Sequence, residues 1–302
     1  MKPFDLQVNG YAGTDFCSAD LTAEQLHHAC QALRDDGADG ILVTLITDAL
    51  DALENKLRNL VRLREADELA RKLVVGFHVE GPFLNPTPGF IGAHEPLHVQ
   101  PATKDAADRL LDAGGGLVKL VTLAPEQDER AAVTEFLVER NITVSAGHCD
   151  PSLDQLRAAC DAGLSMVTHF GNGCPVELPR HDNVLQRLLS QRDRLVFGFI
   201  PDGVHVPFHA LRNYLDLVGP DRAYVTTDAI AAAGLGPGLH EVSGLTVEVD
   251  EVGVARRPGS PNLAGSTLTL PLMCHRLSED LGLSPEAIET LVNQTPRRAL
   301  GL

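Results

Sequence analysis

The stretch VVGFHVE, residues Val74–Glu80, is a short run of mostly apolar residues that ends abruptly in a carboxylate. Such runs, rich in Val, Ile and Leu, are typical of strands covered on both faces of a parallel sheet. Eight of them alternate with amphipathic stretches of helical period. The eight runs are residues 4–8, 40–45, 73–79, 117–123, 142–146, 165–168, 195–200 and 223–227. This alternation predicts an α/β fold, a closed (β/α)8 barrel of the TIM type.

Two segments interrupt the alternation. Residues 81–101 contain five prolines and are too long for an ordinary connection, so we interpret them as an active-site loop. Residues 234–261 contain the strand-like run 244–250 and predict a β-hairpin insertion after the eighth strand. Because no linker or repeat divides the remainder, residues 1–302 are expected to form a single domain.

The composition excludes several classes of partner. The 302 residues include 41 acidic and 25 basic side chains, which gives a formal net charge of −16. Such a protein repels phosphate backbones and anionic lipids, so neither a nucleic acid nor a membrane is expected as a partner. The chain shows no long apolar span and no signal-peptide layout, which predicts a cytoplasmic protein. Six scattered cysteines without a CxxC pair are expected to be reduced.

Polar side chains follow four of the predicted strands, at the end where barrels of this type carry their chemistry. Glu80 ends the third strand, His148 and His169 follow the fifth and sixth, and Asp228 ends the eighth. A carboxylate and two imidazoles can bind a divalent metal and leave a position open for water. Singly, each has a simpler interpretation, since a lone His is usually structural and Asp228 could cap a helix. Together the four residues favour a metal site.

Three nearby residues are interpreted as structural. His78 shares a strand face with Glu80 but lies one layer deeper, so it is assigned a packing or supporting role. Cys149 and Cys174 follow the two histidines and could ligate zinc as thiolates. Because adjacent residues rarely ligate one metal from a strand end, and Cys174 lies in a glycine-containing turn, neither is assigned as a ligand. The sequence lacks the G-x-S-x-G and G-x-G-x-x-G motifs.

Ordered motifs over almost the whole chain resemble those of the N-acetylglucosamine-6-phosphate deacetylases of the amidohydrolase superfamily. The motifs are LQVNG at 6–10, FHVEGPF at 77–83, GAHEP at 92–96, VSAGH at 144–148, TH at 168–169, DGVHV at 202–206, TDA at 227–229 and LAGS at 263–266. The resemblance implies one catalytic divalent metal on Glu80, His148 and His169, with Asp228 as general base and acid. Zinc is the expected cation, although iron, cobalt and manganese suit the same ligands.

The same resemblance implies how an N-acetylated amino sugar, most simply N-acetylglucosamine 6-phosphate, would be bound and hydrolysed. His94, next to Ala93 in the substrate site, would contact the acetamide carbonyl. Asp228 would take a proton as a metal-activated water attacks, and would then protonate the departing amine. The other residues implied to bind substrate are Asn172, Gly173, Arg180 and His205 at the phosphate, and Leu263, Ala264 and Gly265 as a segment closing over the sugar.

The sequence also departs from the family pattern. Gln7 and Asn9 stand where many superfamily members have two histidines for a second metal, which favours a single cation. The family's flanking β-sandwich is expected to be missing. The turn at residues 170–175 and the segment around Arg180 differ from the family, so the chemistry is carried over more directly than the substrate.

Two alternatives therefore stay open. One is a deacetylase or amidohydrolase acting on a different, unphosphorylated N-acyl substrate, because Arg180 could equally be an exposed surface residue beside His181 and Asp182. The other is a non-catalytic sugar-binding barrel, which the four metal-site and base residues disfavour. Family members are commonly dimers, so a homodimer is a further expectation.

Overall fold

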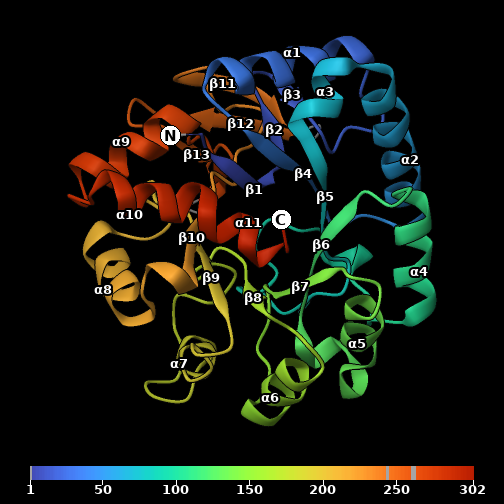
Figure 1. The fold of residues 1–302 in the computed structure, drawn as a ribbon, viewed down its shortest axis with the longest axis vertical. Coiled ribbons are helices and arrows are strands. Elements are labelled where there is room, and N and C mark those ends of the chain that lie inside the picture. The colour runs from blue at the N-terminus through green and yellow to red at the C-terminus, as the bar shows by residue number, and fades with distance from the viewer. Residues whose placement is uncertain (1, 243–244, 260–262) are drawn as a thin grey trace.

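Eight parallel strands form the centre of the molecule, in a nearly closed barrel (Figure 1). The computed structural model describes residues 2–242, 245–259 and 263–302. The barrel strands are β1 (Phe4–Val8), β4 (Gly40–Ile46), β5 (Val74–Glu80), β6 (Val118–Leu123), β7 (Thr143–Ala146), β8 (Met166–Val167), β9 (Val196–Phe199) and β10 (Ala223–Val225). Neighbouring strands in the barrel follow one another in chain order. The predicted (β/α)8 fold is confirmed, with each strand within two residues of its expected bounds.

Helices lie outside the barrel between successive strands, and polar residues cap several of their N-termini. Thr22 and Ser152 each form a capping box, with Gln25 and Gln155 as the reciprocal partners. These outer helices are α1 (Ala23–Asp35), α2 (Leu50–Ala66), α3 (Glu68–Leu73), α4 (Lys104–Ala113), α5 (Ala132–Val138), α6 (Leu153–Asp161), α7 (Val184–Leu189) and α8 (Phe208–Val218). Over the described ranges, none of the helices has the length and apolarity that crossing a membrane requires.

β1 and β10 are the two edges of the barrel sheet, and side chains join them across the closure. The buried Asp5 carboxylate of β1 accepts hydrogen bonds from the Thr227 hydroxyl at 2.6 Å and the Thr227 N–H at 3.0 Å. It also accepts one from the Thr226 hydroxyl. Just beyond the strands, the Asn9 N–H donates to the Ala229 carbonyl at 2.8 Å. The Asp5 side chain and these backbone hydrogen bonds together join the first and last strands.

Apolar side chains fill the amino end of the barrel. Ala299 and Leu300, at the end of the chain, pack against a cluster of buried residues from β1, β4, β6, β8 and β10. The cluster comprises Phe4, Leu6, Leu42, Leu120, Met166 and Tyr224. The helices that reach this end are α9 (Leu270–Glu279), α10 (Pro285–Glu289) and α11 (Thr295–Ala299), with a π-helical turn at Thr290–Gln294. Figure 1 shows α11 across the middle of the ring of strands.

The insertion after β10 is larger than the predicted hairpin. It forms a four-stranded antiparallel sheet of β11 (Gly238–Val242), β12 (Leu245–Val249), β13 (Val254–Arg256) and β14 (Leu263–Ser266). The predicted hairpin is present as β11 and β12. A second turn, in which the Asp250 carboxylate accepts the N–H groups of Val252 and Val254 at 3.0 and 2.8 Å, extends it into the larger sheet. Positions 243–244 and 260–261 of the predicted hairpin lie outside the described residues.

A small sheet of β2 (Gly10–Tyr11) and β3 (Thr14–Asp15) follows β1 directly.

Above the apolar cluster, the barrel interior changes to polar residues. His78 is fully buried, with Nε2 at 2.7 Å from the Thr122 hydroxyl and Nδ1 at 3.5 Å from the Thr44 hydroxyl. Burial lowers the pKa of His78 to about 4, so its ring is neutral. This layer lies directly beneath Glu80, as the strand alternation predicts.

Candidate active site

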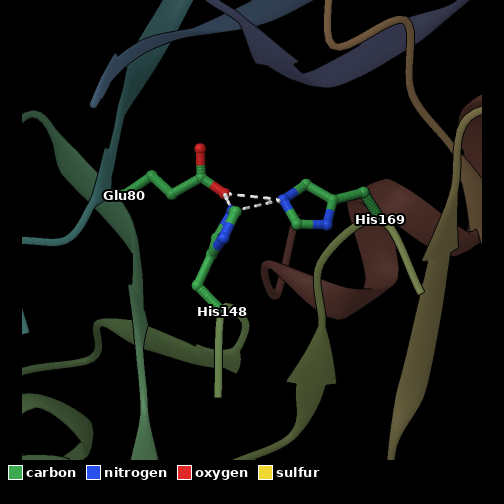
Figure 2. A group of neighbouring side chains, drawn as sticks. All are labelled: Glu80, His148 and His169. Carbon is green, nitrogen blue, oxygen red and sulfur yellow. Dashed lines mark hydrogen bonds and ion pairs between the residues drawn. The ribbon is translucent and has the colours of Figure 1, made fainter. Parts of the chain in front are cut away.

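Glu80, His148 and His169 meet at the carboxyl end of the barrel, as Figure 2 shows. Glu80 is the last residue of β5, and the histidines lie two residues beyond β7 and β8. Glu80 Oε1 is 2.9 Å from His169 Nε2 and 3.5 Å from His148 Nε2, and the two ring nitrogens are 3.0 Å apart. All three side chains are buried. An anionic oxygen and two imidazole nitrogens directed at one point are a donor set that fits a divalent cation.

The ring of His148 is fixed in one orientation. Its Nδ1 lies 2.8 Å from the Phe90 carbonyl oxygen, which can only accept, so Nδ1 carries the proton and Nε2 presents a lone pair to the cluster. Gly92 and Gly173 flank the ring, and a Cβ on either glycine would lie 2.8 Å from a ring atom. Both glycines have φ near +60°. Glycine at these two positions therefore lets two loops pack closely against the ring of His148, a prospective metal ligand.

The two oxygens of Glu80 have different partners. Oε1 faces the histidines, whereas Oε2 accepts a hydrogen bond from Gln7 Nε2 at 3.1 Å. Gln7 is oriented in turn by the Thr168 hydroxyl, which donates to Gln7 Oε1 at 2.5 Å. Burial opposes the charge of Glu80, but its interactions with the His148 and His169 rings outweigh it and hold the pKa of Glu80 well below its ordinary value. The carboxylate is therefore ionised and aimed at the histidines.

Asp228 lies at the same rim and has a different environment. Asn9 Nδ2 donates to Asp228 Oδ1 at 2.7 Å. Removal from bulk water raises the pKa of Asp228 to about 7, although His169 and the Asn9 hydrogen bond act in the opposite direction. No helix starts after Asp228, so the alternative interpretation as a helix cap is wrong. A carboxyl group that titrates near neutral pH is suited to accept and return a proton.

Backbone strain is concentrated in these residues. His148, His169 and Asp228 have φ values of +50°, +27° and +49°. Residues with a side chain rarely adopt this left-handed region, and it costs on the order of 1–3 kcal/mol where the surroundings impose it. Three of the four predicted site residues thus leave the barrel in a strained conformation that turns their side chains toward a common point.

His94 reaches the cluster from the loop at residues 81–101, which was predicted to be an active-site loop. His94 Nε2 lies 3.7 Å from Glu80 Oε2. Its other nitrogen, Nδ1, accepts a hydrogen bond from the Thr47 N–H at 3.3 Å and lies 2.9 Å from the Thr47 hydroxyl. Burial lowers the pKa of His94 to about 3, so the ring is neutral and its remaining proton is on Nε2. His94 therefore presents a hydrogen-bond donor, rather than a metal ligand, to the site.

The residues predicted to bind phosphate do not all lie near the cluster of Glu80, His148 and His169. His205 is mostly buried, has Nδ1 at 2.6 Å from Asp202 Oδ2, and lies close enough to Asp228 to influence its charge. Asn172 donates its side-chain amide to the His169 carbonyl at 3.1 Å. Arg180 is exposed and, within the described part of the chain, makes no ion pair or side-chain hydrogen bond. The structure thus brings Asn172 and Gly173 to the cluster but leaves Arg180 on the surface.

The segment Leu263–Gly265 belongs to β14, whose last residue, Ser266, forms a bridge with Ala229. The Ser266 carbonyl also accepts the Ile230 N–H at 2.9 Å. This predicted closing segment therefore runs beside the residue that follows Asp228. Ala93 is exposed next to the buried His94.

The cysteines do not take part in the cluster. All six are free thiols. Cys149 is buried among apolar residues, and burial raises the pKa of its thiol well above the ordinary value. Burial also raises the pKa of Cys174. Both thiols are therefore protonated at neutral pH, and in the described residues only Glu80, His148 and His169 form a group of potential ligands.

Sequence reasoning missed several residues that hold the site in place. Asn9 on Asp228, Thr47 on His94 and the Phe90 carbonyl on His148 all make contacts across the barrel rim. One signal was present in the sequence, since β1 and the residue after it carry Asp5, Gln7 and Asn9 at every second position of an otherwise apolar run. Each of these three side chains bonds to a residue on another strand end.

Several known proteins are similar to the chain in sequence and in fold. N-acetylglucosamine-6-phosphate deacetylases from Homo sapiens and Bacillus subtilis (strain 168) are 32% and 28% identical over 99% of this chain, which spans 73% and 74% of their lengths. The solved structure of the same enzyme from Mycobacterium smegmatis, a variant with an aspartate replaced by alanine in complex with N-acetyl-D-glucosamine-6-phosphate, superposes with a TM-score of 0.88. That enzyme is 32% identical, and the match covers 100% of this chain and 77% of the other.

Two further comparisons concern protein-family models and a related deacetylase. No protein-family model matches the sequence. An N-acetylgalactosamine-6-phosphate deacetylase from Escherichia coli O157:H7 is 28% identical over 99% of this chain and 77% of its own length. The agreement in sequence with the human relative, together with the shared barrel, is sufficient to assign the family. The chain belongs to the N-acetylglucosamine-6-phosphate deacetylases, which are amidohydrolases.

Proposed function

We propose that this protein hydrolyses the N-acetyl group of N-acetylglucosamine 6-phosphate, releasing acetate and the free amine of the sugar phosphate. The observation that carries the proposal is the buried cluster of Glu80, His148 and His169 beside a carboxyl group, Asp228, whose pKa is raised to about 7. The substrate comes from the relatives, most of which carry this activity in their names.

Glu80, His148 and His169 would hold the catalytic cation, with zinc as the first candidate. A divalent cation bound there would supply Lewis-acid chemistry, making a water molecule acidic enough to lose a proton near neutral pH. Gln7 already satisfies Glu80 Oε2, and Asn9 satisfies Asp228 Oδ1, so neutral amides occupy the side of the cluster where further charged ligands would be needed for a second cation. This supports a single metal.

Asp228 would act as the proton carrier. In its ionised form it accepts a proton from the attacking water, and it then donates that proton to the amine nitrogen as the C–N bond breaks. His94 would contribute separately, because its Nε2–H can donate to the carbonyl oxygen of the acetyl group as negative charge develops there. The Thr47 N–H, which occupies His94 Nδ1, holds the ring in the tautomer that this role requires.

The phosphate would be bound by His205, Asn172 and Gly173, with Leu263, Ala264 and Gly265 lying over the sugar and Ala93 beside the acetyl group. The exposed Arg180 would contribute only if the loop around it, or a second copy of the chain, brings its guanidinium to the site. Charge-assisted bonds of this kind contribute on the order of 1.5–3 kcal/mol each. A substrate without phosphate should therefore bind much more weakly.

A substrate panel tests the proposal. Acetate release would be measured for the purified, metal-loaded protein with N-acetylglucosamine 6-phosphate, N-acetylgalactosamine 6-phosphate and unphosphorylated N-acetylglucosamine. We expect kcat/KM to be highest for the first and at least about 100-fold lower for the unphosphorylated sugar. Equal rates with and without phosphate would overturn the phosphate assignment alone. No acetate from any of the three, with one equivalent of divalent metal bound, would overturn the deacetylase assignment.

A further inference from the structure

A second cavity lies at the opposite end of the barrel from the candidate active site. Its volume is about 650 Å³, within the range of small-molecule sites. It opens at the amino ends of β8, β9 and β10, beside α11. The residues that matter for its chemistry are Met166, Val196, Arg194, Asp221, Arg222 and Arg298. The residues of the candidate active site lie at the carboxyl end of the barrel, so the two sites are separated by the filled barrel interior.

Three arginines line this cavity in a chain whose formal net charge is −16. Arg194 Nη2 donates to Asp161 Oδ1 at 2.7 Å. Arg298 Nη2 donates to the Asp221 carbonyl at 2.7 Å and to the Thr295 hydroxyl at 3.1 Å, and it lies 3.6 Å from Asp221 Oδ1. Arg222 makes no side-chain hydrogen bond or ion pair within the described ranges. Most of the guanidinium donors at the cavity are therefore free to bind an anion.

The base of the cavity is apolar. Met166 is fully buried at the start of β8, and Val196, the first residue of β9, is half-buried. A cavity with guanidinium groups at its mouth and an apolar base can bind a molecule that has an anionic head and a less polar body. Inorganic anions would use only the arginines, whereas a sugar phosphate would use both parts.

We propose that this cavity is a second binding site, for the phosphate group of a small phosphomonoester such as a sugar phosphate. The planar, always-charged guanidinium is the side chain that best matches a phosphate, because it offers two parallel N–H donors. Arg222 and Arg194 supply the free donors, and Arg298 adds positive charge at the rim. A polyanion is a poor match, because the remainder of the acidic surface repels it.

The three methionines make a direct binding experiment possible. They are Met1, Met166 and Met273, and of the two that the structure describes, Met166 lines the cavity and Met273 does not. The metal-loaded protein labelled with ¹³C-methyl methionine would be titrated with inorganic phosphate, glucosamine 6-phosphate and glucosamine at constant ionic strength. We expect the Met166 methyl resonance, assigned with Met166→Leu, to shift saturably with both phosphates but not with glucosamine, and the Met273 resonance to stay in place. We expect glucosamine 6-phosphate to bind more tightly than inorganic phosphate.

Variants separate this site from the candidate active site. Arg222→Ala should weaken binding about tenfold, and the double variant Arg194→Ala/Arg222→Ala should abolish the saturable shift. Arg62→Ala, which removes the same charge from an exposed position on α2, should change nothing. Turnover of the acetylated substrate should stay at the wild-type value in Arg222→Ala. A Met166 shift that persists in the double variant, or no saturable shift at all, would overturn the proposal. Equal affinity for the two phosphates would overturn the role of the apolar base.

Discussion

The two ends of the barrel differ in what their buried side chains do. At the amino end, the cluster around Phe4, Leu120 and Tyr224 is apolar and unstrained. At the carboxyl end, the buried residues are ionisable, hydrogen-bonded to one another and, at three positions, held at positive φ. A single strand contributes to both ends of the barrel, since β10 provides Tyr224 to the apolar cluster and is followed, four residues after Tyr224, by Asp228. Stability and chemistry are thus assigned to different ends of the same strands.

The largest effect is expected at Asp228, where a substitution should separate chemistry from folding. Asp228→Asn keeps the shape of the side chain and its place beside Asn9 but removes the proton acceptor. Turnover should fall by about 10²–10⁴-fold, while metal content by elemental analysis and the midpoint of urea unfolding stay close to the wild-type values. Near-wild-type turnover in this variant would show that Asp228 is not the base.

The opposite result is expected at the amino end. Leu120→Ala removes a fully buried side chain from the apolar cluster and should lower the free energy of unfolding by about 2–5 kcal/mol, measured with urea. The kcat of the folded fraction should be unchanged. Leu120→Met, which conserves volume, is the matched control and should cost less than about 1.5 kcal/mol. A large loss of kcat in the still-folded Leu120→Ala protein would contradict the separation of the two ends.

A smaller effect is expected at Asn9, which acts on the candidate base without contacting the reacting bond. The hydrogen bond from Asn9 favours the ionised form of Asp228, so its loss in Asn9→Ala should raise the pKa of Asp228. Because the base must be deprotonated, the acidic limb of the kcat profile should move to higher pH, with kcat at neutral pH about tenfold lower. An unchanged pH profile with lower kcat would show that Asn9 has only a structural role.

The smallest effect is expected for Asp202, a carboxylate at the carboxyl end that pairs with His205. Burial raises the pKa of Asp202, but the His205 hydrogen bond and charge outweigh it and leave the pKa below its ordinary value. A lowered carboxyl pKa stabilises the fold above the unfolded-state pKa, and this contribution is lost as the pH falls through the folded-state value. Asp202→Asn should therefore lose about 1 kcal/mol at pH 7. The difference from wild type should disappear in acid, as measured by unfolding at several pH values.

Local sequence patterns were sufficient for most of the barrel. The eight strands were predicted because each is a short apolar run, and the capping residues Thr22 and Ser152 mark where two of the helices begin. The insertion was predicted less well, because the turn at Asp250 depends on an aspartate that bonds backbone groups two and four residues on, and no Asn-Gly or Asp-Gly pair marks it.

The candidate site also has a part that the sequence predicts and a part that it does not. Glu80, His148, His169 and Asp228 could be named from the sequence because strand ends of a barrel converge by topology. Their orientation could not, since it depends on pairs such as Asn9 with Asp228, which are 219 positions apart in the chain. Likewise the arginines of the second cavity come from separate connections and the last helix, and no local pattern links Arg194, Arg222 and Arg298.

Under the proposed mechanism, the Asp5 carboxylate makes closure of the barrel a condition for turnover. It accepts hydrogen bonds from both the N–H and the hydroxyl of Thr227, and the next residue in the chain is Asp228, the proposed proton carrier. The hydrogen bonds between Asp5 and Thr227 that join the first and last strands thus also fix the orientation of Asp228. Under the proposed mechanism, a chain folded only as far as β9 would have every proposed metal ligand but no oriented carboxylate, and it would be inactive.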